Sequence, residues 1–509
     1  MSEIAQLFFS VLPFAGFVYL LIFRKISLIK TSLATLALTT VLVVFFWQII
    51  PGQIIVSYAK GFFVALDIFI IIGGAIFFLE ILKRFGVIES VSFYLESFSG
   101  DFRIQVILLA WFLENFIEGT AGFGTPSAVV APLLVGLGIE PLTAAVLSLL
   151  GNSTSVVFGA AGAPIRIGFS GLDISGVPYY AALINMIGMI VPLFMLWAVV
   201  EHHQERKKLF IEAVPFALWS GFIFVFSSFL VVPLGQEFPS IIGAVVGLAI
   251  VFLTTKLGIF VPKNIYRTRS VVNLKPKLSL LKTVLPYFLL ITFLILGKLF
   301  LSGVFLKMPF GVNHSVNLFN PGFAFIVAGL IIAVWWLWAL RRIQKQPKNF
   351  ILKSFGFSFK QAAGPFLVII AMSSMVQLMI NSGNNYSGLE SLINIIARVF
   401  ETEFLPFLAP LAGAFGSFLT GSATISNLLF GGFLAQAASG LSMPQSIILA
   451  LILVGGAAGN MIALADMLAA ETVVGLKHRE REILGRIFLP CLIYVVFAGI
   501  LGFMAVRLF

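Results

Sequence analysis

Long apolar segments constrain the fold of this chain more than any other feature of its sequence. Twelve of them recur along 509 residues, each close to the length of about 20 residues that a helix needs to cross a bilayer. They lie at about 5–23, 32–50, 61–82, 141–165, 178–200, 212–234, 239–260, 283–302, 321–340, 361–382, 443–465 and 487–507. With 60% hydrophobic and 10% charged residues, the composition excludes a soluble globular domain. The sequence therefore predicts an all-α polytopic membrane protein with about 12 transmembrane helices.

Two additional pairs of apolar segments are shorter, at about 13–17 residues per segment. They are 104–118 with 126–138 and 405–418 with 424–440. Such lengths favour re-entrant hairpins, at 104–138 and 405–440, over complete spans. Each pair turns at a cluster of glycine, threonine and serine, which are poor choices for a helix that faces lipid.

Each predicted hairpin is followed by an apolar run that polar and glycine residues interrupt. The run 141–165 contains Gly-Asn-Ser-Thr-Ser at 151–155, and the run 443–465 contains Gly-Gly-Ala-Ala-Gly-Asn at 455–460. Irregular backbone at membrane depth is tolerated only where protein buries it or where it lines a wet cavity. Paired interrupted segments therefore indicate the binding site of a transporter.

Positively charged residues predict the orientation of the chain, whose net charge is +11. The rich clusters follow the first, third, fifth, seventh, ninth and eleventh runs, so all of them fall on one side of the membrane. That side is expected to be the cytoplasm, which places both termini outside. The clusters are Arg24, Lys25 and Lys30; Lys83, Arg84 and Arg103; Arg206, Lys207 and Lys208; Lys263, Arg267, Arg269, Lys275, Lys277 and Lys282; Arg341, Arg342, Lys345, Lys348 and Lys353; and Lys477, Arg479, Arg481 and Arg486.

The chain also repeats itself. Gly-Val-Ile-Glu-Ser at 86–90 and Gly-Leu-Glu-Ser-Leu at 388–392 each precede an amphipathic stretch, a hairpin and an interrupted helix. On the predicted orientation the first hairpin opens to the cytoplasm and the second to the outside. This pattern predicts an inverted-topology repeat with a substrate site near the membrane midplane. The predicted division is 1–60 for N-terminal scaffold spans, 61–200 for the first repeat, 201–360 for central scaffold spans with basic cytoplasmic loops, and 361–509 for the second repeat.

Phe-Ile-Glu-Gly-Thr-Ala-Gly-Phe-Gly-Thr-Pro at 116–126 resembles the EGxxGFGxP signature of the bacterial L-lactate/glycolate permease family. The resemblance continues at 133–142, 159–165, 418–430, 459–463 and 473–482. It implies proton-coupled import of L-lactate and related 2-hydroxy-monocarboxylates, such as glycolate or D-lactate, across a bacterial cytoplasmic (inner) membrane. It also implies the two-hairpin architecture and elevator motion of the wider ion transporter superfamily. Asp466 and Glu471 depart from the small or neutral polar residues of the family pattern, which leaves the transported acid and its coupling open.

A carboxylate inside a bilayer needs hydrogen-bond donors that do not hold it permanently. Backbone N–H groups at hairpin tips and helix starts, with neutral hydroxyls and amides, meet this need. The alternative is that small residues let helices pack closely and that serine and threonine satisfy backbone groups. The predicted substrate-binding residues are Thr120, Gly122, Gly124, Thr125, Ser127, Asn152, Ser153, Thr154, Thr420, Gly421, Ser422, Thr424, Ser426, Asn427 and Asn460.

Proton coupling needs a carboxyl group that exchanges a proton during transport. The candidates are Glu118 beside the first hairpin tip, Glu114 one helical turn earlier, Asp466, and Asp67 within the third run. Acidic residues inside a membrane are costly and indicate function. The alternative for each is a structural hydrogen-bond partner. Arg166 is interpreted as a helix anchor, or as a group that attracts anions at the mouth of the site.

Other functional classes have little support in the sequence. The only cysteine is Cys491, the four histidines lie in loops, and Gly297-Lys298 lacks the rest of a nucleotide-binding loop. We therefore expect no enzyme, no cofactor, no metal site and no nucleic-acid partner. A membrane-embedded enzyme, a passive anion channel and a sodium-coupled or differently selective carboxylate transporter are the alternatives. The expected partners are a small carboxylate, the coupling ion (H⁺, or alternatively Na⁺) and lipid, and self-association stays open.

Overall fold

Helices make up most of the molecule. The computed structural model describes residues 2–122, 124–267, 278–301, 304–307, 315–340 and 349–508, and within them twelve helical segments are long and apolar enough to cross a membrane. They are Glu3–Phe23, Leu28–Phe45, Pro51–Arg84, Pro141–Arg166, Val177–Val200, Arg206–Leu234, Pro239–Lys256, Leu280–Leu301, Pro321–Trp338, Phe350–Asn381, Gln445–Val473 and Glu480–Leu508. Each overlaps one predicted run, so the predicted all-α polytopic membrane class is confirmed.

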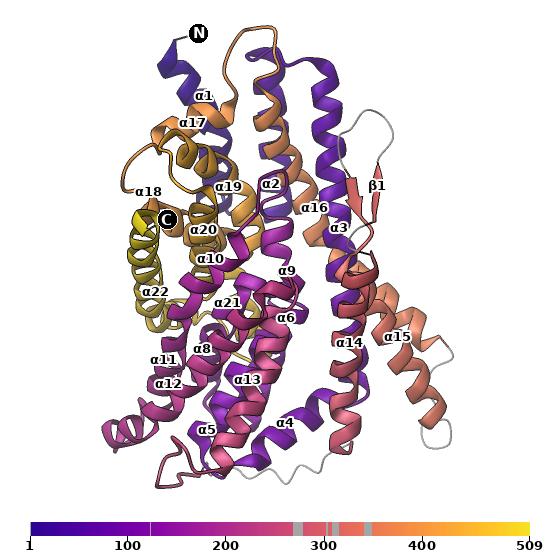
Figure 1. Ribbon diagram of the computed structural model, residues 1–509, viewed down its shortest axis with the longest axis vertical. Helices are drawn as coiled ribbons and strands as arrows, with labels where there is room; N and C mark the ends of the chain where they lie inside the picture. Colours follow the sequence, from indigo (N-terminus) through magenta and orange to yellow (C-terminus); the bar gives the residue numbers. More distant parts are fainter. Residues whose placement is uncertain are drawn as a thin grey trace.

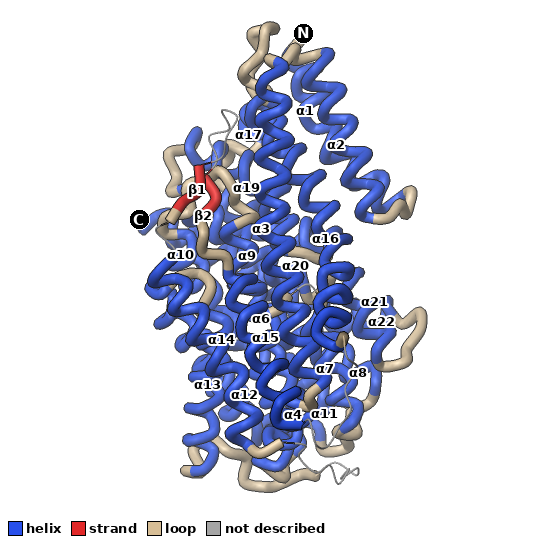
Figure 2. The backbone as a smooth tube through the Cα atoms, turned by 90° about the vertical axis from the view of Figure 1, so that its right-hand side faces the viewer, coloured by secondary structure: helices blue, strands red, loops and turns tan. Residues whose placement is uncertain are grey.

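The predicted orientation of the chain in the membrane, with both termini outside, stays a prediction. Part of the basic segments on which it depends lies outside the described residues, namely Arg269, Lys275, Lys277, Arg341, Arg342, Lys345 and Lys348. Both chain ends lie in the upper half of the molecule as drawn (Figures 1 and 2).

The two short apolar pairs form helix–turn–helix units. In the first, α5 (Phe102–Ile107), a π-helical turn (Leu108–Leu113) and α6 (Glu114–Thr120) make one limb, and α7 (Thr125–Gly136) makes the other. In the second, α18 (Leu405–Thr420) and α19 (Ala423–Gly440) are joined by a two-residue turn. These bounds agree with the predicted segments within a few residues, and the re-entrant placement of the pairs in a membrane stays a prediction.

The helix after the first hairpin is interrupted where the sequence predicts it and for several residues beyond. α8 (Pro141–Asn152) passes into a 3₁₀ helix (Ser153–Phe158) and then into α9 (Gly159–Arg166). Inside α9 the backbone takes left-handed conformations at Ala160 (φ 42°), Ala161 (φ 51°) and Gly162 (φ 78°). For alanine this conformation costs about 1–2 kcal/mol per residue, so the surrounding packing must hold the turn in place.

The helix after the second hairpin breaks later than predicted. α20 (Gln445–Asn460) continues through the Gly-Gly-Ala-Ala-Gly-Asn segment, and the interruption falls at 461–463, before α21 (Leu464–Val473). The glycines have another function: a Cβ atom at Gly455 would lie 2.0 Å from the Pro410 carbonyl oxygen, and one at Gly459 would lie 2.2 Å from that of Ala414. They therefore allow α18 to pack directly on α20.

Helix packing defines two groups (Figure 1). In the group named here the α3 group, α3 lies along α15 and α16, α2 lies on α16, and α14 lies on α15. Glycines make these contacts close: a Cβ atom at Gly61 of α3 would lie 2.1 Å from Ser374 Oγ of α16. The members of the α3 group are α2 (Leu28–Phe45), α3 (Pro51–Arg84), α14 (Leu280–Leu301), α15 (Pro321–Leu340) and α16 (Phe350–Asn381).

The second group, named here the hairpin group, contains both hairpins and both interrupted helices. α18 packs on α20 and α22, α12 packs on α11 and α13, and α13 packs on α6. Its further helices are α10 (Val177–Ile184), α11 (Val191–Val200), α12 (Arg206–Val231), α13 (Pro239–Lys256) and α22 (Glu480–Leu508). The predicted division of the chain into scaffold and repeat segments stays a prediction.

The remaining elements lie mainly at the ends of the molecule. Amphipathic helices α4 (Val87–Phe98) and α17 (Leu392–Val399) lie at opposite ends (Figures 1 and 2). They begin within the repeated segments, whose glycines both adopt left-handed backbone, Gly86 at φ 74° and Gly388 at φ 69°. Helix α1 (Glu3–Val18) packs on α2, and the antiparallel strands β1 (Phe305–Lys307) and β2 (Ser315–Asn317) pair from Phe305 with Asn317 to Lys307 with Ser315.

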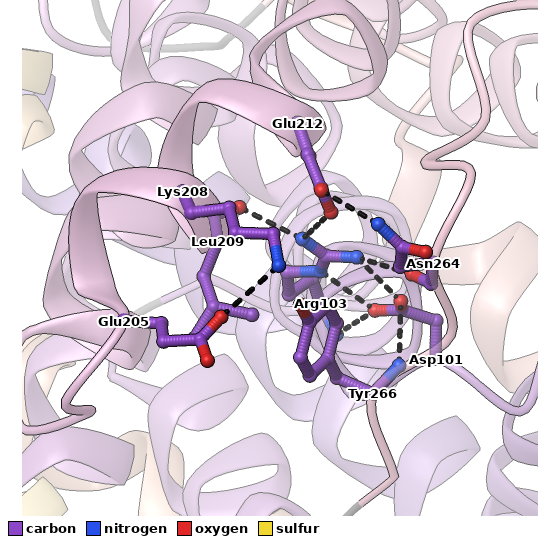
Figure 3. Close-up of polar contacts among 8 residues, drawn as sticks. All are labelled: Asp101, Arg103, Glu205, Lys208, Leu209, Glu212, Asn264 and Tyr266. Carbon is purple, nitrogen blue, oxygen red and sulfur yellow. Dashed lines mark hydrogen bonds and ion pairs between the residues drawn. The ribbon is translucent and has the colours of Figure 1, made fainter.

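A buried arginine secures the base of the first hairpin (Figure 3). Arg103 is fully buried, and its guanidinium donates to both carboxylate oxygens of Asp101 at 3.0 and 2.7 Å. It also donates to the backbone carbonyls of Leu209 and Asn264, each at 2.8 Å, and lies 3.5 Å from the Glu212 carboxylate. These contacts join α5 to α12 and to the segment that follows α13, so they connect three parts of the hairpin group.

Candidate functional site

A small cavity lies where both hairpin tips meet both interrupted helices. Its volume is about 20 Å³, which is enough for about one water molecule. The lining residues are Glu118 and Gly122 from the first hairpin, Val156, Gly159, Ala160 and Pro164 from the first interruption, Gly421, Ser422, Ala423 and Thr424 from the second hairpin, and Asn460 from the end of α20. Segments separated by more than 300 residues therefore share one polar site.

The first hairpin tip places an acidic side chain at this cavity. Glu118 is 4% exposed, and its Oε2 atom has no hydrogen-bond partner among the described residues. The tip turns through left-handed glycines, Gly122 at φ 54° and Gly124 at φ 73°, and Phe123 between them lies outside the described residues. A Cβ atom at Gly159 would lie 2.4 Å from Glu118 Oε1. Glycine at 159 therefore leaves the space that the carboxyl group occupies.

Glu114 lies deeper in the same hairpin and does not line the cavity. It is fully buried; Ser127 Oγ donates to its Oε1 at 3.4 Å, and its Oε2 has no partner in the described structure. A Cβ atom at Gly151 would lie 3.2 Å from that Oε2. Asn115 is also fully buried, and neither side-chain polar atom of it has a partner within the described part of the chain. Glu114 and Ser127 thus join the two limbs of the hairpin behind the cavity.

The second hairpin tip brings the start of a helix to the cavity. Gly421 is left-handed at φ 68°, and Ser422 caps α19 by accepting the Ile425 N–H at 3.4 Å. Thr420 Oγ1 donates to the carbonyls of Gly416 and Ser422 at 2.8 and 3.1 Å. The first N–H groups of a helix lack partners inside the helix and carry partial positive charge. The start of α19 can therefore receive an anion.

Polar contacts hold the second hairpin against the first interruption. Asn427 Nδ2 donates to the Pro164 carbonyl at 2.9 Å. Ser426 Oγ donates to the Gly413 carbonyl at 2.8 Å, which joins the two limbs of the hairpin. Neither residue lines the cavity; both position the tip that does.

The Asn-Ser-Thr segment of the first interruption faces away from the cavity. Ser153 Oγ donates to the Leu150 carbonyl at 2.7 Å. The carbonyl of Thr154 accepts Asn185 Nδ2 at 3.0 Å, and Asn185 in turn accepts the Tyr494 hydroxyl at 2.6 Å. Asn152 is fully buried with both amide atoms unpartnered among the described residues. The cavity wall is formed instead by the Gly-Ala-Ala-Gly-Ala-Pro segment that follows.

Asp466 connects the second interruption to the first hairpin tip. Its Oδ2 accepts Asn460 Nδ2 at 2.8 Å, and a Cβ atom at Gly124 would lie 2.8 Å from its Oδ1. Asp466 is 4% exposed and near enough to Glu118 for the two groups to interact electrostatically. Within the described residues, no group of three or more His, Cys, Asp and Glu side chains is placed to hold a metal ion.

Asp67 lies apart from the cavity, at the contact between the two helix groups. Its Oδ2 is 4.0 Å from Nη2 of Arg166, the last residue of α9, and Asn320 Nδ2 donates to its backbone carbonyl at 3.0 Å. A second ion pair crosses the same contact: Lys298 Nζ of α14 lies 3.0 Å from Oε2 of Glu237, just before α13. The structure therefore places both Asp67 and Arg166 in contacts between groups.

Six of the predicted site residues line the cavity: Glu118, Gly122, Gly421, Ser422, Thr424 and Asn460. The structure does not place the others in the cavity lining; apart from Asp67 they are Thr120, Gly124, Thr125, Ser127, Asn152, Ser153, Thr154, Thr420, Ser426, Asn427, Glu114 and Asp466. The sequence-based prediction did not include the lining residues Gly159, Ala160, Pro164, Val156 and Ala423, nor the buried Asn115 behind the cavity. The run of small residues at 159–164 was the available signal for the first three, because backbone can line a cavity where side chains are small.

A cavity enclosed by two hairpin tips and two interrupted helices, inside a bundle with twelve candidate spans, indicates a multi-pass membrane transport protein. Comparison with known proteins agrees. The sequence model of the L-lactate permease family matches residues 6–308 and 301–509. The chain belongs to the L-lactate permease family. This is a family of permeases, so the expectation of a transporter rather than an enzyme is confirmed.

Individual relatives match along most of their length. The chain is 31% identical over 488 residues to the putative L-lactate permease of Haemophilus influenzae, which covers 86% of this chain and 87% of the relative. It is 27% identical to the L-lactate permease of Escherichia coli K12, over 96% and 94% of the two chains. It is also 27% identical to the glycolate permease GlcA of the same organism, over 93% and 91%.

Proposed function

We propose that this protein is a proton-coupled symporter that imports L-lactate and related 2-hydroxy-monocarboxylates, such as glycolate or D-lactate, across the bacterial cytoplasmic membrane. The substrate class is supported by the names of its relatives, which are L-lactate and glycolate permeases. The coupling is supported by one observation above all: the buried Glu118 carboxyl, whose Oε2 has no hydrogen-bond partner among the described residues, lines the cavity at the junction of the two hairpins.

The substrate carboxylate is expected to bind at the start of α19. Ser422, Ala423 and Thr424 line the cavity there. The N–H groups of Ala423 and Thr424 and the hydroxyls of Ser422 and Thr424 can donate to a carboxylate, whereas the Ser422 N–H donates to Thr420 Oγ1 at 3.3 Å. Asn460 and the backbone at Gly122 and Ala160 complete a neutral surface for the 2-hydroxyl group. A neutral site binds an anion reversibly, which a carrier requires.

Glu118 is expected to carry the coupling proton. A negative Glu118 beside the substrate carboxylate would place two like charges in a buried site, which is strongly unfavourable. Protonation of Glu118 removes this repulsion, so substrate and proton bind together and leave together. The same residues would bind substrate and proton in an elevator mechanism. In that mechanism the hairpin group slides against the α3 group, and the cavity stays between the hairpin tips.

The substitution Glu118→Gln tests the coupling role. The amide keeps the shape of the side chain but cannot release a proton. In liposomes with an inward proton gradient, we expect accumulation of labelled L-lactate by the variant to fall strongly, because the proton that Glu118 carries is lost, while exchange of internal for external lactate continues. Replacing external sodium with potassium at fixed pH should leave wild-type uptake unchanged. Unaltered pH-driven accumulation by the variant would exclude Glu118 from this role.

A further inference from the structure

A second acidic side chain belongs to the same polar site. The Asp466 carboxyl lies between the first hairpin tip and the turn that follows α20, in contact with Gly124 on one side and Asn460 on the other. Asn460 lines the cavity, so Asp466 is one hydrogen bond from it. Any movement that separates the tip from α21 changes the surroundings of this carboxyl group.

Among the described residues, neither acidic group at the site has a cationic partner. The ion pairs formed by the described residues include neither Asp466 nor Glu118. One acidic group faces Asp466 from α6: Glu118, which interacts with it electrostatically. Glu114, further along α6, interacts with Glu118. Glu471, near the end of α21, accepts the Arg479 N–H. An unpaired charge in a buried site is strongly unfavourable. Asp466 therefore needs a proton or a bound cation when the site is closed.

One proton shared between the two carboxyl groups would not satisfy both. Sharing requires direct contact between the two carboxyls, and no hydrogen bond joins Glu118 to Asp466 in the described structure. Asp466 instead accepts from Asn460, and Glu118 lies against Gly159 and Gly122. The two carboxyl groups would therefore hold their protons at separate positions, and a bound substrate anion would add a third negative charge at the same site.

We propose that Asp466 is a second proton-carrying residue, so that two protons enter with each monocarboxylate anion. This inference rests on the proposed symport function and extends it. Two H⁺ and one carboxylate bind from outside and all three are released inside, so each cycle moves one net positive charge inward. Transport should then respond to the membrane potential as well as to the pH gradient. With Glu118 as the only proton carrier, the cycle would be electrically neutral.

The first test uses wild-type protein in liposomes at equal internal and external pH. A potassium gradient with valinomycin sets an inside-negative potential, and labelled L-lactate uptake is followed. We expect the potential alone to drive accumulation, with a reversal potential that gives two protons per lactate. Uptake that follows a pH gradient but ignores the potential would overturn the two-proton cycle and leave the symport function intact. Absence of pH-driven uptake would instead reject the symport function itself.

The second test assigns the extra proton to Asp466. Asp466→Asn keeps an oxygen that can accept from Asn460, and we expect it to lower the ratio from two protons to one and to abolish the response to potential. Glu471→Gln, a matched loss of an acid on the same helix, should keep the ratio of two. If Asp466→Asn is inactive, Asp466→Glu should retain a ratio of two. A ratio of two in Asp466→Asn, or a response to potential that requires sodium, would overturn the assignment.

Discussion

At the scale of single residues, small side chains around the cavity determine where the acidic groups lie. Gly159 has extended backbone (φ −64°, ψ 158°), which any residue can adopt, so its backbone does not require glycine. Glycine is needed at this position because a side chain would not fit: a Cβ atom here would lie 2.4 Å from Glu118 Oε1. The glycine of the Gly-Ala-Ala-Gly-Ala-Pro segment therefore sets the position of the Glu118 carboxyl.

Gly159→Ala should displace that carboxyl without breaking the fold. We expect proton-driven lactate uptake to fall roughly 10–100-fold, because a shift of about 1 Å in a functional group has effects of this size. The thermal unfolding midpoint should change little, because the Glu118 side chain can move. Gly136→Ala is the control: a Cβ atom there meets nothing within 4 Å, so uptake should stay at the wild-type level. Normal uptake by Gly159→Ala would show that the position of Glu118 tolerates movement.

At the scale of elements, the first hairpin depends on the buried Arg103 cluster at its base (Figure 3). The cluster joins α5 to α12 and to the segment at Asn264 and Tyr266, where the Tyr266 N–H donates to Asp101 at 3.1 Å. Because α12 packs on α13, and α13 packs on α6, the hairpin is held at its base and along its length. We therefore expect this hairpin to move with α12 and α13 as one unit.

Removal of Arg103 should destabilise the protein strongly. Arg103→Ala leaves Asp101, which is 2% exposed, without its partner. Loss of one member of a buried ion pair costs about 3–5 kcal/mol. Arg84→Ala removes the partially exposed pair with Glu80, for which a loss of about 0–1 kcal/mol is expected. Thermal unfolding in detergent should therefore shift far more for Arg103→Ala, and equal shifts would contradict the structural role of the cluster.

Helix composition explains which elements the sequence could predict. Apolar length located the twelve spans and both short pairs, because hydrophobic transfer depends mainly on composition. The break after α20 was placed too early because glycine has two uses in membrane helices. Gly455 and Gly459 allow close contact with α18, and that contact exists only in the folded structure. The start of α19 at the cavity was predictable, since Ser422 follows a glycine and precedes an apolar run.

At the scale of the whole molecule, two ion pairs formed by described residues connect the α3 group to the hairpin group. They are Asp67 with Arg166 and Lys298 with Glu237. The sequence could not reveal them, because each joins residues that are far apart in the chain and adjacent only after folding. Asp67 was predicted as a proton-coupling candidate from its depth in an apolar run, and that role stays a prediction. An elevator motion would separate both pairs.

A cross-link across this contact tests the motion. In a Cys491→Ala background, Glu237→Cys and Lys298→Cys together remove both charges, so neither is left buried alone. We expect this variant to transport lactate until a short bismaleimide joins the two cysteines, after which uptake should stop. The control pair Glu212→Cys and Asn264→Cys lies within the hairpin group, where the two side chains are hydrogen-bonded at 2.8 Å. Its cross-link should leave uptake intact, and continued transport with 237 joined to 298 would argue against sliding at this contact.

The small size of the cavity has a consequence for affinity. A volume of about 20 Å³ holds about one water molecule, so a hydroxy acid enters only after the hairpin tips separate. The apparent dissociation constant is then the dissociation constant of the open site divided by the fraction of molecules in which the site is open. If roughly 1% are open, binding is weakened about 100-fold relative to an open site. A substitution that merely loosens the contact between Gly122 and Ala160 would therefore tighten apparent binding without touching the ligand, and selectivity among hydroxy acids would be unchanged.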